Sequence, residues 1–520
     1  MLRILLYVLL VVGAQAATLR HCAEAGPSSL DPAIGNTLPD HDAVGAPLFN
    51  TLIEIDRTSG RLQPGLAEAW TVSADGRDYR FRLRRGVAFH HRPWFTPSRP
   101  LDARDVVQSL QRLLDPQHPL RLQSPALLFP YVISFGLPAL VERVSAEGHW
   151  GVHIRLREAS APFLRHLAQP FAAIQSAEYL SQLRARGQLA ELARAPIGTG
   201  PFMFDSQVPG SLLRYVRHPQ YWQAGRPKLD KLLIRIEPDA AVRSQKLRTA
   251  ECDTASMPPM ADWDRLAREP DLQLHNLAGS NIGQLVFNTA KPPLNQRAVR
   301  EALSLAIDRQ ALLRAVYHGH ARLARGLLPP SSWAYTSQLP LPAYDPERAR
   351  RLLAAAGVGA LQIKLWAMPI ARVYNPNARL MAEMIQADWA RVGVRAEIIS
   401  FEWGEYRRRL DADEHEAALI GWTLSADPDP IFSSLRCGNQ DNRSDWCNPA
   451  YDALVERARG LGSESARSRL YRQAQAIVRD ELPLLTLAHG GVAFAMRRNV
   501  QGFVPSPLGS FRFDTVNLAP

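Results

Sequence analysis

The sequence is informative first for what it has little of. Only five of its 61 basic residues are lysines, and its four cysteines include no Cys-x-x-Cys pair. That spacing is typical of structural zinc sites, so its absence argues against one, and we expect neither a metal nor another cofactor. The Gly-x-Ser-x-Gly segment that carries the nucleophile of α/β-hydrolases is also missing. No low-complexity tract or internal repeat is present, and the 46% hydrophobic content is that of an ordinary globular protein.

The positive charge is not arranged as a nucleic-acid-binding surface would need it. The formal net charge is +11, but the arginines are scattered and interleaved with acids, as in residues 102–105 and 456–459. A nucleic-acid partner requires basic residues gathered on one face or along one stripe. We therefore expect no nucleic-acid partner, and we interpret the excess of arginine over lysine as codon usage in a GC-rich genome.

Long apolar runs are confined to the N-terminus. Residues 1–16 combine Arg3, the apolar run 4–12 and the small-x-small segment 14–16. This pattern is typical of a secretory signal peptide, and the run is too short to cross a membrane. The remaining chain of about 500 residues is long enough for two or three domains. We expect a soluble, exported protein.

Four cysteines in an exported chain permit disulfide bonds. Cys437 and Cys447 have nine residues between them, in a polar loop that a bridge would close, and this pairing would leave Cys22 with Cys252. Three connectivities are possible, and the spacing alone does not choose among them. A metal site is the competing interpretation.

The stretch 363–429 predicts alternating strands and helices. Strands are expected at 363–367, 394–398 and 417–422, with helices at 377–393 and 403–412 between them. This βαβαβ order implies parallel strands joined by right-handed crossovers. In such sheets ligands bind beyond the carboxyl ends of the strands.

Two loops leave those carboxyl ends with charged side chains. The loop 368–376 carries Arg372, and the loop 423–430 carries Asp427 and Asp429. An arginine and a pair of carboxylates are thus directed at one crevice. The pattern predicts a site for a solute that carries both charges.

Elsewhere the sequence predicts a mixed architecture. It indicates a hairpin around Asp75-Gly76, an antiparallel pair within 144–156, a helix at 103–114 capped by Asp102, and a long helix at 296–316. The mix favours an α/β fold with a β-rich insertion near the N-terminus.

Several segments resemble, in order, those of a known family. They include Pro-Gly-Leu-Ala-Glu-Ala-Trp at 64–70, Trp-Phe-Thr-Pro at 94–97, Pro-Ile-Gly-Thr-Gly-Pro-Phe at 196–202, Phe-Asn-Thr-Ala-Lys-Pro-Pro-Leu at 287–294 and Glu-Trp-Gly-Glu-Tyr at 402–406. Along nearly the whole mature chain the sequence resembles the peptide-binding proteins of bacterial ABC importers, solute-binding family 5. Within that family it is most similar to the dipeptide-binding and Sap-type branches.

The resemblance implies a periplasmic binding protein-like α/β fold, in which two lobes enclose a cleft and an extra domain is inserted into lobe one. The implied ranges are 18–50, 195–278 and 495–520 for lobe one, 51–194 for the insertion, and 279–494 for lobe two. The resemblance also implies the disulfides Cys22–Cys252 and Cys437–Cys447, so that neither bridge crosses the cleft.

The resemblance assigns a role to Arg372. In the dipeptide-binding branch an arginine in the matching loop takes the carboxylate of the peptide, and a planar guanidinium suits a carboxylate in this way. The alternative is a solvated loop arginine. Trp403 and Trp422 are candidate walls of the cleft, although core packing is the commoner place for a tryptophan.

The chain departs from the family at the residue that binds the α-amino group. The branch has an aspartate three residues after the tryptophan that matches Trp422, and Ser425 stands at that place here. Asp427 is the first carboxylate that follows. Either Asp427 reaches the ligand, or Ser425 occupies the position without charge, which argues against free peptide amines as ligands.

The resemblance implies a periplasmic, monomeric binding protein without catalytic activity, which captures a short peptide and delivers it to an inner-membrane ABC permease. One alternative is a Sap-like binder of cationic antimicrobial peptides, haem or a polyamine. Another class of protein, a secreted hydrolase using His41, Asp42 or the Asp427/Asp429 pair, is a further alternative, although paired carboxylates alone prove little.

Overall fold

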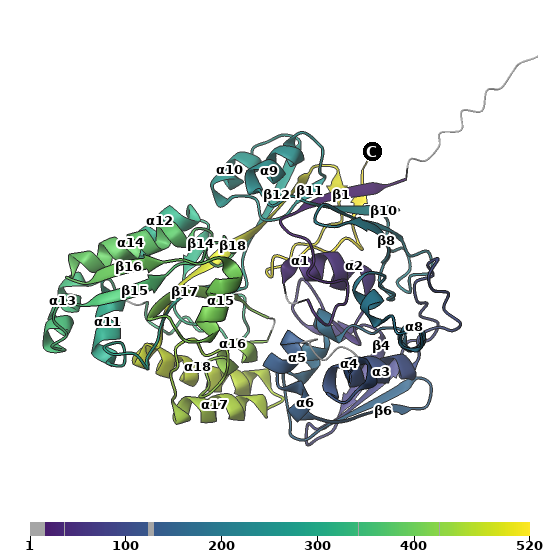
Figure 1. Cartoon of the computed structure of the whole chain (residues 1–520), viewed down its shortest axis with the longest axis horizontal. Helices are drawn as coiled ribbons and strands as arrows, with labels where there is room; N and C mark the ends of the chain where they lie inside the picture. The colour runs from purple at the N-terminus through teal and green to yellow at the C-terminus, as the bar shows by residue number, and fades with distance from the viewer. Residues whose placement is uncertain (1–15, 36, 123–128, 342, 426, 520) are drawn as a thin grey trace, which may run out of the picture.

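A computed structural model describes residues 16–35, 37–122, 129–341, 343–425 and 427–519. The predicted signal peptide, apart from its last residue, lies outside these ranges. The chain forms two α/β lobes, as the sequence predicts (Figure 1). Helices α11 to α18 gather around one lobe and helices α1 to α8 around the other. The exact lobe boundaries given above stay a prediction.

One sheet of twelve strands within the described ranges runs through both lobes, in the order β16-β15-β17-β13-β18-β11-β1-β10-β9-β8, with β12 and β14 also paired to β18. The strands are β1 (Thr18–Ala23), β8 (Phe202–Val208), β9 (Leu212–Arg217), β10 (Lys231–Ile236), β11 (Thr254–Ala255), β12 (Leu272–Ala278), β13 (Asn281–Phe287), β14 (Ala321–Leu323), β15 (Gln362–Trp366), β16 (Arg395–Ile399), β17 (Ala417–Thr423) and β18 (Leu484–Arg497).

Strand β18 is the element that the two lobes share. Its first part pairs with β13 and β14, and its second part pairs with β12 and β11. The change of partners falls at Gly490 and Gly491. A Cβ atom on Gly490 would lie 2.1 Å from the carbonyl oxygen of Val373, and one on Gly491 would lie 2.7 Å from that of His320. Only glycine permits this close backbone approach.

The lobe with the predicted βαβαβ segment confirms that prediction. Strand β15 pairs in parallel with both β16 and β17. Helix α14 (Ala378–Arg391) begins at Asn377, whose side chain accepts a hydrogen bond from the Leu380 N–H at 3.0 Å. Its apolar face places Trp389 in the core, where the indole N–H donates to the Leu303 carbonyl at 3.0 Å. Besides α11 and α12, described next, the other helices of this lobe are α13 (Pro346–Ala355), α15 (Trp403–Asp411), α16 (Asp429–Ser433), α17 (Pro449–Arg459) and α18 (Glu464–Glu481).

The predicted long helix at 296–316 is wrong, because the chain forms two helices there. They are α11 (Arg297–Leu305) and α12 (Arg309–Tyr317). Asp308 lies between them, and its side chain accepts a hydrogen bond from the Ala311 N–H at 2.9 Å. An aspartate that caps a new helix offers the backbone an alternative to continuing the old one.

The N-terminal insertion has a sheet and a core of its own, as predicted. Its strand order is β4-β5-β7-β6, all antiparallel. Helix α3 (Ala103–Leu114) covers this sheet and begins with a capping box formed by Asp102 and Asp105. The strands are β4 (Ala67–Val72), β5 (Asp78–Leu83), β6 (Val141–Glu147) and β7 (Gly151–Leu156).

The remaining elements are short or lie at the edges of the lobes. They are α1 (Leu38–Asp40), α2 (Ala46–Leu48), α4 (Pro119–Leu122), α5 (Pro130–Ser134), α6 (Leu137–Leu140), α7 (Phe163–Leu167), α8 (Ala177–Ala185), α9 (Ala240–Arg248), α10 (Trp263–Leu266), β2 (Ile53–Ile55), β3 (Leu62–Pro64), β19 (Val500–Gln501) and β20 (Asn517–Leu518).

The cysteines pair as the family resemblance implies. Cys22 is bonded to Cys252, and Cys437 is bonded to Cys447, with Cα atoms 6.0 Å and 4.5 Å apart. Cys22 lies on β1, and Cys252 precedes β11, which pairs with β1. Each bridge therefore ties neighbouring segments together. Within the described ranges, no helix is both long and apolar enough to span a bilayer.

Candidate functional site

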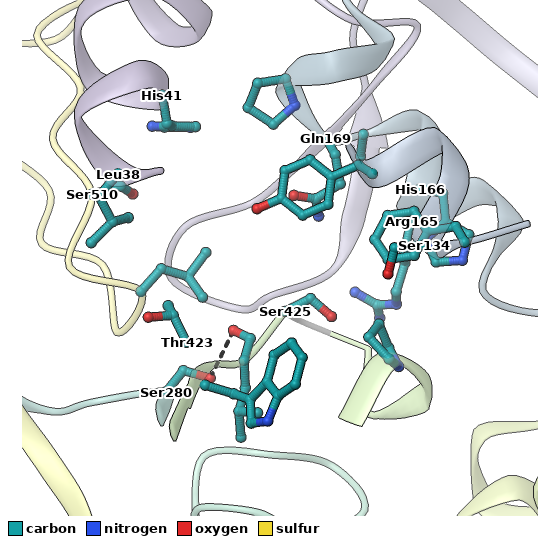
Figure 2. A pocket seen from close by; sticks show the side chains of 18 of the residues that line it. Leu38, His41, Ser134, Arg165, His166, Gln169, Ser280, Thr423, Ser425 and Ser510 are labelled. Carbon is teal, nitrogen blue, oxygen red and sulfur yellow. Dashed lines mark hydrogen bonds between the residues drawn. The ribbon is translucent and has the colours of Figure 1, made fainter. Parts of the chain in front are cut away.

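A cleft of about 2180 Å³ lies between the two lobes. Ordinary small-molecule pockets measure roughly 300–1,000 Å³, so this one has room for a larger solute or for several water molecules beside a small one. Figure 2 shows Thr423 and Ser425, at and after the end of β17, facing Leu38, His41 and Gln169 of the other lobe. The cleft thus opens at the carboxyl end of β17, where the sequence predicts ligand groups.

Arg372 lies in the loop after β15 and lines the cleft. Its backbone exchanges two hydrogen bonds with Asn375, at 2.9 and 3.0 Å, which fix the turn. Its guanidinium carbon lies 5.0 Å from the ring centroid of Trp403. A cation over an aromatic face is held in place without losing its charge. The structure therefore brings together two residues that the sequence singles out, Arg372 and Trp403.

The charge of Arg372 is not neutralised within the described part of the chain, where its guanidinium forms no ion pair with a carboxylate. Arg372 and a second arginine, Arg407, both lie within electrostatic reach of Tyr374. Burial raises the pKa of Tyr374, and the charges of Arg372 and Arg407 partly offset that rise. Two positive charges thus act on the same buried phenol.

Sequence reasoning missed Arg407, although a signal was present. Arg407 lies four residues after Trp403 on α15, so both residues share one face of that helix, and both line the cleft. The next two arginines on α15, Arg408 and Arg409, both bind Glu405. Arg407 is exposed and has no such partner among the residues that the structure describes.

Both tryptophans that the sequence proposes as walls line the cleft. The ring of Trp403 stacks on Tyr406 with centroids 5.9 Å apart and an angle of 16° between the planes. Trp422, near the end of β17, is partly buried and packs against the core of the same lobe. Whether either ring touches a ligand stays a prediction.

Ser425 lines the cleft and presents a neutral side chain there. Its hydroxyl donates a hydrogen bond to the Asp427 carbonyl at 2.6 Å, which closes the loop on itself. In Figure 2 the side chain of Ser425 lies near Thr423 on one side and near Arg165 on the other.

Asp427 is placed differently from Ser425. Its side chain is buried and does not line the cleft. Both carboxylate oxygens accept hydrogen bonds from Arg467, at 2.9 and 2.6 Å, and Arg165 lies 3.6 Å away. An ammonium group would have to displace these contacts. Asp427 as the amine-binding residue stays a prediction, and this bidentate pairing weighs against it.

The Asp427–Arg467 pair is strongly coupled. Burial lowers the pKa of Arg467, but the hydrogen bond and the charge of Asp427 outweigh that effect, so the pKa lies above its ordinary value. Asp429 is also buried, and it accepts a hydrogen bond from the Tyr471 hydroxyl at 3.3 Å. Burial and the nearby charge of Asp427 raise the pKa of Asp429, while Arg459 lowers it.

The two lobes touch across the mouth of the cleft through Arg165, a second residue that sequence reasoning missed. Arg165 on α7 donates to the Gly60 carbonyl at 2.9 Å and to Glu464 on α18 at 3.1 Å, besides its approach to Asp427. The Ala161 N–H donates to the Arg459 carbonyl at 2.7 Å. No local sequence pattern indicates such contacts, because they join segments that are far apart along the chain.

His41 and Asp42, which the sequence suggests for a hydrolase, form a hydrogen-bonded pair, but no nucleophile is bound to them in the described chain. The His41 Nδ1 atom lies 2.9 Å from Asp42, and this is the side-chain hydrogen bond that the structure gives His41. Burial raises the pKa of Asp42, and His41 lowers it. In the described chain no serine, threonine or cysteine is hydrogen-bonded to His41, and no cluster of three potential metal ligands occurs.

Two α/β lobes that share a sheet and enclose a cleft define the class of two-lobe solute-binding proteins. Residues 61–444 match the family of bacterial extracellular solute-binding proteins, family 5 (middle region). The chain belongs to this family, which confirms the assignment made from the sequence motifs.

Known relatives match along almost the whole chain. A di/tripeptide-binding protein 1 of Pseudomonas aeruginosa (strain UCBPP-PA14) is 41% identical over 508 residues, which are 97% of this chain and 94% of the relative. A dipeptide-binding protein of Escherichia coli (strain K12) is 40% identical over 510 residues, 97% of this chain and 95% of the relative. The crystal structure of a dipeptide binding protein from Pseudoalteromonas sp. SM9913 in complex with Met-Leu is 34% identical, with a TM-score of 0.88, and the match covers 96% of this chain and 100% of that one.

Proposed function

We propose that this protein is the periplasmic substrate-binding component of an ABC importer, which captures short peptides in the interlobe cleft and delivers them to an inner-membrane permease. It acts as a monomer and by binding alone, without turnover. Relatives about 40% identical along the whole chain are named as di- and tripeptide-binding or dipeptide-binding proteins, which supports a peptide-class ligand.

The observation that carries the proposal is the state of Arg372. This residue lies over Trp403 in the cleft, with its charge unpaired among the described residues. A guanidinium held in this way is prepared for a bidentate contact with a carboxylate such as a peptide C-terminus. Family resemblance assigns the same role to the matching arginine.

Closure of the lobes is the proposed mechanism. A solute that bridges Arg372 on one lobe and groups near His41 on the other binds the closed form more tightly than the open one, so it shifts the population toward closure. The contacts of Arg165 with Glu464 and Asp427 add to the closed form. A permease can then distinguish loaded from empty protein by shape.

The same arginines argue against a polycation as the ligand. Arg372 and Arg407 both line the cleft and both act on Tyr374. A polyamine or a cationic antimicrobial peptide would place like charges beside them in a partly dry site, which is costly. Haem stays an alternative that the experiment below separates from peptides.

Native mass spectrometry of protein purified without denaturation tests the proposal directly. We expect a co-purified species of peptide mass on a monomer, and isothermal titration calorimetry should then show micromolar or tighter binding of that species. Co-purified haem, or no binding by any di- or tripeptide, would contradict the proposal. Hydrolysis of the bound peptide during the titration would contradict the assignment as a binder without turnover.

A further inference from the structure

We propose that the cleft selects short peptides that carry carboxylates and no free ammonium group, that is, N-blocked acidic peptides. The inference rests on the proposed function and narrows it to a substrate class. Three observations carry it: two unpaired cations on one wall of the cleft, the pairing of the buried acids near them, and the neutral residue at the end of β17.

The cations are Arg372 and Arg407. They come from the β15–α14 loop and from α15, and both line the cleft beside Trp403. Both are close enough to Tyr374 to act on its ionisation. Neither forms an ion pair with a carboxylate in the described ranges. This wall therefore offers two positive charges to a solute, which fits two carboxylates better than one.

The acids on the same wall are already bound by other arginines. Asp429, which lines the cleft, lies 3.5 Å from Arg459, and Asp411 lies 2.6 Å from Arg443. Asp441 also lies 3.4 Å from Arg443. Asp427 is withdrawn behind Ser425 and held by Arg467, as described above. Glu464, the remaining acid of this wall among the described residues, is paired with Arg165, so each of these acids already has an arginine partner.

The opposite wall offers little more to an ammonium group. Glu24, after the end of β1, accepts a hydrogen bond from the Ser256 hydroxyl, and its charge acts on Arg243. Its other acids lie in a capping box (Asp40), in pairs with arginines (Asp31 with Arg112, Glu54 with Arg512) or at the solvent-facing rim (Asp56 and Glu158). Glu24 therefore already shares its charge with Ser256 and Arg243, and the acids of this wall without an arginine partner, Asp56 and Glu158, are accessible to water.

The position of Ser425 determines whether the cleft favours a free ammonium group or a blocked amide nitrogen. This residue lines the cleft two residues after the end of β17, in the same cavity as Arg372, and its side chain faces the opposite lobe. Its hydroxyl is neutral and is engaged with the Asp427 carbonyl. A hydroxyl does not offset the cost of moving an ammonium group from water into a closed cleft, whereas a blocked amide nitrogen carries no such cost.

A matched pair of peptides tests the inference on the full mature chain. Isothermal titration calorimetry compares N-acetyl-Leu-Glu with Leu-Glu, which differ only at the amino end. We expect the acetylated peptide to bind at least about tenfold more tightly, because it leaves no ammonium beside the arginines. Equal affinity, or tighter binding of Leu-Glu, would overturn the inference and leave the proposed function intact. If neither these two nor a panel of other di- and tripeptides binds, both fail.

Variants make the test independent of the choice of peptide. Ser425→Asp should reverse the order of the two affinities, while Ser331→Asp, which adds the same charge at an exposed position on the rim of the cleft, should leave the order unchanged. Arg407→Ala should weaken N-acetyl-Leu-Glu more than N-acetyl-Leu-Ala. Only the first peptide has a side-chain carboxylate that can pair with Arg407. The inference is wrong if Ser425→Asp folds with a wild-type melting temperature and still prefers the acetylated peptide to the same degree. Equal losses for the two acetylated peptides in Arg407→Ala would overturn the assignment of the second carboxylate to Arg407.

Discussion

The two loops that leave the carboxyl ends of β15 and β17 start from neighbouring strands of one sheet, yet they present opposite situations for charge. The first loop holds Arg372 in the cleft, against an aromatic ring and without a carboxylate partner in the described chain. The second loop holds Asp427 away from the cleft, with both oxygens bound by Arg467. Topology places both loops at the same edge, but the elements packed behind them decide which charge a solute can reach.

The difference lies in what stands behind each loop. Behind Asp427 and Asp429 lie α17 and α18, which supply Arg459, Arg467 and Tyr471. Behind Arg372 lies α15, which supplies Trp403 and another cation. Buried acids with buried arginines form a structural network, whereas an arginine on a ring remains available for binding.

The largest expected effect comes from breaking the network behind the β17 loop. Arg467→Met leaves Asp427 buried without its bidentate partner and should lower the free energy of unfolding by about 3–5 kcal/mol. Guanidinium-induced unfolding, followed by circular dichroism, measures this loss. Arg469→Met, at an exposed position on the same helix, should change it by less than about 0.5 kcal/mol. Equal effects of the two variants would show that the pair has no structural role.

The opposite result is expected at the β15 loop, where binding rather than stability should change. Arg372→Ala should cost about 2–5 kcal/mol of affinity for a bound peptide and little stability, because it removes one partner of a desolvated charge pair. Arg372→Lys should also lose affinity, since the fork geometry is lost. Calorimetry measures both, with Arg379→Ala on the outer face of α14 as the control. An unchanged affinity in Arg372→Ala would remove this residue from the site.

Acidification should lower the stability of the protein, because His166 is buried close to Asp427 in the loop after β17. Burial lowers the pKa of His166 to about 3, although the charge of Asp427 acts in the opposite direction. As the pH falls, His166 therefore binds a proton in the unfolded state before it does so in the folded state. The free energy of unfolding that this residue contributes above pH 6.5 is lost as the pH falls toward 3. His166 contributes a slope of roughly 1.4 kcal/mol per pH unit within that window. His166→Phe, which keeps an aromatic ring against Phe135, should reduce the slope by this amount. Equal slopes in wild type and His166→Phe would contradict the assignment.

The smallest effect is expected at the contact between the lobes. Arg165→Ala removes the hydrogen bond to Glu464 and the approach to Asp427, and it should weaken ligand binding by about 1 kcal/mol, because these contacts join the lobes in the closed form. Small-angle scattering should show a smaller compaction on addition of ligand. Arg157→Ala, at an exposed residue on the rim of the cleft, serves as the control. If both variants bind like wild type, the Arg165 contacts do not contribute to closure.

The sequence by itself determined the parts that depend on local pattern. Alternation of strand and helix signals over 363–429 predicts three parallel strands, and β15, β16 and β17 confirm them. A capping aspartate predicts α3, and the order of motifs predicts the family and both disulfides. The place of Arg372 in a loop at the ligand-binding edge follows from the same pattern. The strands and the helix depend on residues within a few turns of one another, whereas the family and its disulfides follow from the resemblance of motifs read in order along the chain.

Only the tertiary structure decided which charges are free. Asp427 and Arg467 are separated in the sequence by two α-helices, α16 and α17, and by a disulfide loop, and Arg165 comes from the inserted subdomain, so no local pattern brings the three together. The predicted helix at 296–316 failed for a similar reason, since Asp308 caps a new helix and its N–H donates to Asp388. Burial and ion pairing depend on neighbours in space, and the strength of a charge depends on its access to water. Sequence order therefore placed the candidate ligand groups at one edge of the sheet, and packing determined that Arg372 lines the cleft while Asp427 is buried and bound by Arg467.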